Sequence, residues 1–127
     1  MQHFPLSVSA IMRHGCGVHG KRRVSTALGD NRYAHKTYRE VGQDAGRLAN
    51  ALRRLGVAGD QRIGTFMWNN AEHLVAYLGV PSMGAVLHTL NIRLSPSRSL
   101  SSRIRLKIKW FWSMCRWRRC SLRCSTI

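Results

Sequence analysis

The chain has 127 residues, of which 44% are hydrophobic, so it is long enough to bury the core of one small domain. Its formal charge of +16 is uneven: the segment Ser95–Ile127 holds 9 of the 21 Lys and Arg residues and none of the 5 Asp and Glu residues, so the average does not define a nucleic-acid-binding class for the whole chain. No apolar run reaches the ~18 residues that span a bilayer and no basic residue precedes the mildly apolar stretch Phe4–Met12, so we expect a cytoplasmic chain with reduced thiols and no signal peptide.

The first predicted elements are short. Leu6–His14 fits a short helix and a short strand equally well. Val24–Leu28 and Arg32–Lys36 are typical of two strands, because the turn-forming residues Gly29, Asp30 and Asn31 lie between them.

The clearest predicted element is a helix that begins after Thr37. Thr37 followed by Glu40 is the pattern of a capping box, in which each side chain bonds a free amide of the first turn. Gly56 is suited to the left-handed residue that ends such a helix. The predicted apolar stripe of this helix repeats every three or four residues and consists of Val41, Ala45, Leu48, Leu52 and Leu55.

A strand, a helix and a strand follow. Arg62–Trp68 is predicted to be a strand, Asn69 or Asn70 to cap the helix, and Pro81 to lie near its end. Ala85–Leu90 is predicted to be a further strand. The apolar positions of the helix are Leu74, Tyr77 and Leu78. The order strand-helix-strand-helix-strand predicts an α/β fold with a parallel sheet and right-handed crossovers.

One glycine-rich stretch resembles a nucleotide loop. Gly15, Gly17 and Gly20 spell G-x-G-x-x-G, and Gly15–Lys21 spells most of a phosphate-binding loop. The second pattern requires Ser or Thr where Arg22 stands, and the first requires a helix where a strand is predicted. We therefore interpret the stretch as a flexible connection.

Other polar residues do not form a recognisable site. Three ligands within six residues, with no fourth nearby, rarely bind a metal, and no serine lies in a nucleophile elbow. We therefore assign no catalytic, cofactor-binding or metal-binding residue. The residues considered are His14, Cys16 and His19 as a cluster, His73 and His88 as single histidines, and Ser82.

The C-terminal segment differs in composition from the rest. Its cysteines, Cys115, Cys120 and Cys124, lie five and four residues apart, which is not a paired zinc-ligand spacing. Arg103–Lys109 alternates charged and aliphatic residues like a strand without a partner. An alternative function is a small cationic protein that binds nucleic acid or an anionic membrane surface. It would act through Arg116, Arg118, Arg119 and Arg123 with Trp110, Trp112 and Trp117.

From about Phe4 to Pro96 the chain resembles the N-terminus of long-chain fatty-acid–CoA ligases, which are AMP-forming acyl-CoA synthetases of the adenylate-forming superfamily. The resemblance is carried by TYREV (Thr37–Val41), by RLANALRRLGV (Arg47–Val57) and by the run Gly59–Pro96, which contains NNAEH and GAVLHTLNIRLSP. It implies that the chain is the partial N-terminal portion of the large adenylate-forming domain.

The resemblance also implies a reaction in which ATP and a fatty acid give an acyl-adenylate and pyrophosphate with Mg²⁺, and coenzyme A then displaces AMP. The family's phosphate loop, acidic magnesium ligand, adenine-binding motif and C-terminal lysine all lie downstream of this region. None matches a residue here. We therefore expect the chain to be inactive by itself, with no cofactor or partner of its own beyond weak, non-specific anion binding by its tail.

The resemblance stops after Ser95–Pro96. If the codons of Ser97–Met114 are read one base out of register, they can encode EQIAFIAHPAEDKVVLVD, which resumes the family pattern. Tryptophan has a single codon, so the tryptophan positions leave no freedom of codon choice in this alternative reading. We interpret residues 1–96 as the N-terminal part of the ligase domain and 97–127 as an out-of-frame, irregular tail. Without the remainder, the stripe Val41, Leu48 and Leu55 is expected to lack covering neighbours. Pairing with a separately made remainder stays open.

Overall fold

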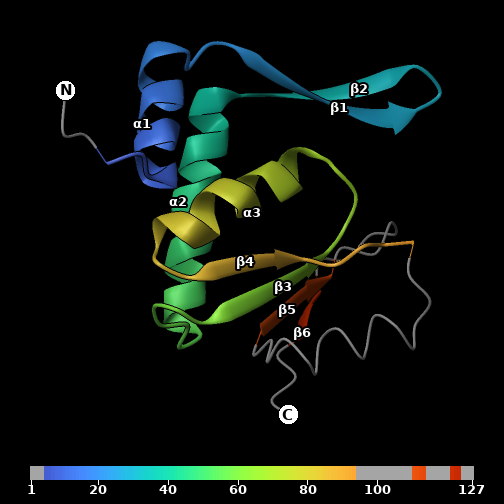
Figure 1. Cartoon of the computed structure of the whole chain (residues 1–127). Coiled ribbons are helices and arrows are strands. Elements are labelled where there is room, and N and C mark those ends of the chain that lie inside the picture. The colour runs from blue at the N-terminus through green and yellow to red at the C-terminus, as the bar shows by residue number, and fades with distance from the viewer. Residues whose placement is uncertain (1–4, 94–109, 114–120, 124–127) are drawn as a thin grey trace.

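The computed structural model describes residues 5–93, 110–113 and 121–123 (Figure 1). Within these ranges a two-stranded sheet has the order β1-β2 and a four-stranded sheet has the order β4-β3-β5-β6. The elements in chain order are α1 (Val8–Val18), β1 (Arg23–Gly29), β2 (Arg32–Thr37), α2 (Tyr38–Arg54), β3 (Arg62–Phe66), α3 (Ala71–Ser82), β4 (Val86–Thr89), β5 (Trp110–Ser113) and β6 (Ser121–Arg123).

The segment Leu6–His14, which fitted a helix and a strand equally well, lies largely in helix α1. The helix also corrects the interpretation of the glycine-rich stretch. Its N-terminus is capped by Ser7, whose Oγ accepts a hydrogen bond of 3.2 Å from the amide of Ala10. Gly15 and Gly17 lie inside the helix, so the flexible connection predicted there was wrong. Packing against α2 outweighs the low helix propensity of glycine: the Cys16 thiol donates to a backbone carbonyl of α2 at 3.1 Å.

The hairpin β1–β2 confirms the two predicted strands, which pair antiparallel. Asp30 and Asn31 have φ values of 52° and 56°, and a turn with two such central residues matches the twist of the strands that it joins. In the described part of the chain β2 pairs only with β1, so Arg32–Lys36 belongs to this hairpin and not to the parallel sheet. The tight turn lets the backbone amides and carbonyls of the two neighbouring strands form hydrogen bonds with each other.

Helix α2 has the predicted capping box and ends before Gly56, which has a φ of +86°. The expectation of an uncovered stripe was wrong for Val41, which is 0% exposed, and for Leu48, which packs against both core clusters. It holds for Leu55, which is 43% exposed because the helix ends there. Val41 and Leu48 are covered because α1 and α3 both lie against α2 (Figure 1).

The unit β3–α3–β4 is the parallel crossover that the sequence predicts. β3 and β4 pair parallel, with Ile63 opposite Leu87, and Asn70 caps α3. Ile63 and Leu87 belong to a core cluster with side chains of α2 and α3, so both helices cover the same face of this sheet (Figure 1). Gly79 permits the close approach of the helices, since a Cβ there would lie 2.9 Å from the carbonyl oxygen of Ala45.

Two described strands lie in the C-terminal segment that the sequence suggested to be irregular. β5 pairs parallel with β3, and β6 pairs antiparallel with β5. The segment Arg103–Lys109, predicted to be strand-like, falls outside the described residues. Among the helices that the structure describes, none is long and apolar enough to cross a bilayer.

Candidate functional site

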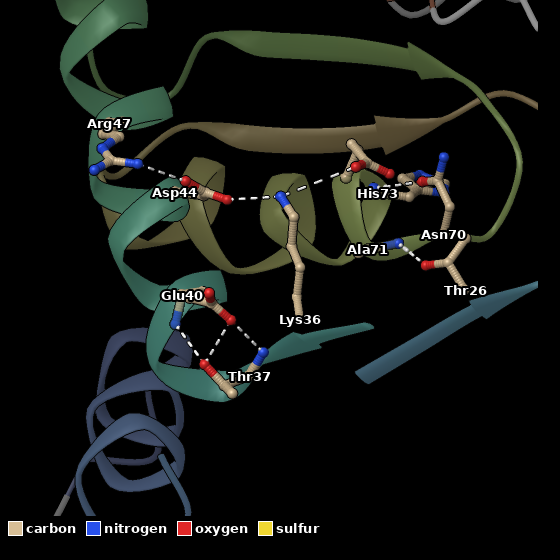
Figure 2. A network of polar contacts seen from close by, with 10 residues as sticks. Thr26, Lys36, Thr37, Glu40, Asp44, Arg47, Asn70, Ala71 and His73 are labelled. Carbon is tan, nitrogen blue, oxygen red and sulfur yellow. Dashed lines mark hydrogen bonds and ion pairs between the residues drawn. The ribbon is translucent and has the colours of Figure 1, made fainter. Parts of the chain in front are cut away.

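A network of polar side chains joins the hairpin to helices α2 and α3 (Figure 2). The Lys36 ammonium of β2 lies 2.7 Å from Asp44 Oδ2 on α2 and 4.0 Å from Glu72 Oε1 on α3. Arg47 lies 3.0 Å from the other Asp44 oxygen. One lysine therefore ties three elements together.

The pairing stabilises the charged form of each group. The hydrogen bond from Lys36 lowers the pKa of Asp44 below its ordinary value, and the same bond raises the pKa of Lys36. Both groups are therefore charged at neutral pH. A carboxylate held in this way is a poor general acid or base, because proton exchange would break the pair.

The beginning of α2 shows the capping box in full (Figure 2). Glu40 Oε2 accepts hydrogen bonds from the Thr37 amide at 2.7 Å and from the Thr37 hydroxyl at 2.8 Å. The Glu40 amide donates to Thr37 Oγ1 at 3.3 Å. These bonds, the backbone amide of Thr37 first, lower the pKa of Glu40, so this carboxylate serves the helix end.

Two backbone amides in the first turn of α3 donate hydrogen bonds to side chains. Asn70 Oδ1 accepts from the His73 amide at 2.9 Å, and Thr26 Oγ1, from the hairpin, accepts from the Ala71 amide at 3.0 Å. The His73 ring is 5% exposed and shares a hydrogen bond of 3.2 Å with Thr65 of β3, and burial lowers its pKa. The amides that could bind an anion at this helix end are thereby partly taken by the protein itself.

The nucleotide-loop patterns are placed at the wrong end of a helix. Gly15 and Gly17 lie in the last turns of α1 and Gly20 follows its end, where carbonyl groups carry partial negative charge. Phosphate binding requires the amide-rich N-terminal end of a helix. The strand predicted after the stretch is present as β1.

The other candidates considered from the sequence are also placed. His14 and His19 have ring centroids 5.8 Å apart, and Cys16 donates its thiol to a carbonyl of α2. In the described ranges, no three His, Cys, Asp or Glu side chains gather as a metal site would require. His88 is half-buried on β4 and Ser82 lies in the last turn of α3.

The network residues Thr26, Lys36 and Asp44 were not singled out from the sequence. The contact of Thr26 with Ala71 joins positions 45 residues apart, which no local pattern reveals. The described network binds elements to one another, and its chemistry is that of structural support.

Comparison with known proteins gives the same fold and a family. The N-terminal domain of FACL13 from Mycobacterium tuberculosis aligns with 86% of this chain at a TM-score of 0.77 and 21% identity, and the chain covers 27% of that structure. The long-chain-fatty-acid–CoA ligase of Thermus thermophilus is 42% identical over 91 residues, which are 72% of this chain and 17% of that protein.

A second relative is named for a different substrate. The 3-methylmercaptopropionyl-CoA ligase of Ruegeria lacuscaerulensis is 34% identical over 94 residues, or 74% of this chain. The chain spans only 17% of the length of either of these relatives. Residues 16–102 match the family described as AMP-binding enzyme. The chain therefore belongs to the AMP-binding enzyme family, and it corresponds to the N-terminal part of the acyl-CoA ligases in that family.

Proposed function

We propose that this chain is the N-terminal structural segment of a fatty-acid–CoA ligase and that it performs no catalytic step by itself. In the whole enzyme the reaction would join a fatty acid to coenzyme A at the expense of ATP, with AMP and pyrophosphate as products. The segment would supply β3, β4 and their two covering helices as a scaffold for the catalytic groups of the rest of the domain.

The observation that carries this proposal is the use of the polar side chains. Lys36 and Asp44 bond to each other, Glu40 caps α2, and the hydroxyl of Thr26 caps α3. Acyl-adenylate formation needs groups that are positioned on ATP and on a carboxylate, with a cation that offsets the phosphate charge. Side chains committed to the fold do not provide such groups.

The preference for a fatty acid rests on the Thermus thermophilus ligase, which has the higher identity of the two reported relatives. A chimera tests the role of the segment. Residues 16–93 of this chain replace the matched segment of the Thermus enzyme, and formation of acyl-CoA is measured. We expect the chimera to retain the fatty-acid specificity of its host. A chimera that folds but makes no acyl-CoA would contradict the proposed role.

We also propose that residues 97–127 are read in a shifted frame. The family match ends at residue 102, close to the point at which the resemblance stops. The strand β5, Trp110–Ser113, coincides with the letters VVLV of the alternative reading, and both readings place bulky apolar residues at the first three of these positions. Determination of the nucleotide sequence tests this proposal: if one added base after the codon of Pro96 does not open a longer frame, the proposal is wrong.

A further inference from the structure

The ring of His73 is a buried titratable group in the first turn of α3. It is 5% exposed, and its Nε2 shares a hydrogen bond of 3.2 Å with the hydroxyl of Thr65, which is itself 0% exposed. The other ring nitrogen, Nδ1, is buried and makes no hydrogen bond of good geometry within the described residues. The Tyr77 ring lies against His73, with ring centroids 4.7 Å apart. The surroundings therefore suit a neutral ring.

Two features of the surroundings oppose a proton on this ring. Both nitrogens of a protonated ring are donors, so Thr65 can accept from Nε2 only, and the charge stays buried. His73 is also the third residue of α3, where the helix dipole is positive and disfavours a cation. Burial accordingly lowers the pKa of His73 below its ordinary 6.5, although an interaction with the Trp68 backbone acts in the opposite direction.

The acidic side chains on the elements that pack against α3 are already paired. Glu72, in the same turn as His73, lies 4.0 Å from Lys36 of β2, and Lys36 lies 2.7 Å from Asp44 of α2. Glu40 caps α2. The other ionisable side chains on α1, α2, β1, β3 and β4 are exposed or half-buried cations, histidines and neutral groups, namely Arg13, His14, Cys16, Arg23, Tyr38, Arg39, Arg47, Arg53, Arg54, Arg62 and His88.

The turn that holds His73 also holds the hairpin (Figure 2). The Ala71 amide donates to Thr26 Oγ1 of β1 at 3.0 Å, and the Glu72 carboxylate lies near Lys36 of β2. Three consecutive residues of α3 therefore connect this helix end to both strands of the hairpin and, through His73, to β3. A change that displaces the His73 ring must move the same turn.

We propose that His73 is an acid-sensitive latch for the hairpin β1–β2. Trp68, which precedes the capping residue Asn70, is 56% exposed, so the first turn of α3 begins beside solvent. When the ring takes up a proton, it reaches water by displacement of this turn, and the contacts of the hairpin with Ala71 and Glu72 are lost with it. The latch concerns the fold alone and does not depend on the proposed role in a ligase.

The test compares the complete wild-type chain with His73→Phe, which keeps a ring but cannot take up a proton. Chemical denaturation is measured from about pH 7.5 to about pH 5, the range in which histidines titrate. The contribution of the neutral ring is complete above pH 6.5 and is lost as the pH falls through the lower folded-state value, because the unfolded chain then binds one more proton. We expect the unfolding equilibrium constant of the wild type to rise relative to His73→Phe by up to about tenfold per pH unit. His14→Phe, at an exposed position of α1, is the matched control and should show no such divergence from the wild type.

Amide exchange locates the opening within the chain. At about pH 5.5 the Ala71 amide of the wild type, corrected for the intrinsic pH dependence of exchange, should lose protection. The Val80 amide, in the same helix at a position with 0% exposure, should keep its protection. In His73→Phe both amides should stay protected. An NMR titration of the His73 ring in the wild type measures its protonation directly and needs no variant.

Three results would each overturn the proposal. The first is a parallel dependence of stability on pH in the wild type and His73→Phe. The second is a His73 ring that titrates at or above pH 6.5 in the folded chain. The third is equal loss of protection at Ala71 and Val80, which would show global unfolding instead of release of the hairpin. If His73→Phe does not fold, the ring titration and the wild-type exchange decide the question.

Discussion

The helical core and the hairpin of this chain are held in place by different forces. Under α2 and α3 the contacts are apolar and close: Val41 and Val80 are 0% exposed. Most residues of the hairpin β1–β2 are exposed; Val24 packs against the core cluster around Val41, and the remaining described contacts to the helices are polar, through Thr26 and Lys36. The comparison teaches that the core determines whether the chain folds, whereas the polar contacts determine where the hairpin lies.

The largest expected effect is the loss of the core. Val41→Asp places an unpaired charge at a position with 0% exposure, and we expect it to cost at least about 3 kcal/mol and to abolish cooperative thermal unfolding monitored by circular dichroism. Leu55→Asp, at the exposed end of the same helix, is the control and should leave the transition nearly unchanged. Equal effects of the two substitutions would show that α2 does not pack as described.

The crossing of α2 and α3 gives the next largest effect. Gly79→Ala would place a Cβ 2.9 Å from Ala45 O, and overpacking of this kind costs about 1–3 kcal/mol. Gly46→Ala is the matched control: it lies in α2 with nothing within 4 Å of the added carbon, and it should stabilise the helix by about 0.5–1 kcal/mol. Chemical denaturation measures both. Changes of the same sign would contradict the close crossing.

The contact between hairpin and α3 should have an intermediate effect. Thr26→Val removes the oxygen that accepts from the Ala71 amide and leaves the shape of the side chain nearly unchanged. We expect a loss of about 1 kcal/mol and faster amide exchange at Ala71, and Thr26→Ser should restore both. Unchanged exchange at Ala71 would mean that the hairpin is not anchored there.

The ion pair of Lys36 and Asp44 gives the smallest effect, and it depends on pH. The pKa of Asp44 is lowered from its ordinary 3.8, so its stabilising contribution is present above pH 3.8 and is lost as the pH falls through the folded-state value. Because both side chains are partly exposed, we expect Asp44→Asn to cost less than about 1 kcal/mol at pH 7. Denaturation at several pH values should show this difference vanish in acid; a difference that grows in acid would be inconsistent with the shift.

Local patterns were enough to predict the elements that are stabilised locally. The capping box of Thr37 and Glu40 and the glycine after α2 were all correct, because each involves bonds between neighbouring residues or a backbone angle. The resemblance to fatty-acid–CoA ligases added the family, which the comparisons confirm.

What the sequence did not reveal depends on contacts between distant residues. Gly15 and Gly17 are helical because α1 packs on α2, against their own propensity. The pairing of β5 with β3 is equally non-local. The network around Lys36 could not be predicted, since it needs the positions of three elements at once.

The most direct test of the central claim is a reaction mixture of the purified chain with ATP, Mg²⁺, a long-chain fatty acid and coenzyme A, in which AMP is quantified. Because the described side chains bond to one another instead of presenting groups to a substrate, we predict no AMP above the mixture without protein. AMP release that requires both the chain and the fatty acid would contradict the account.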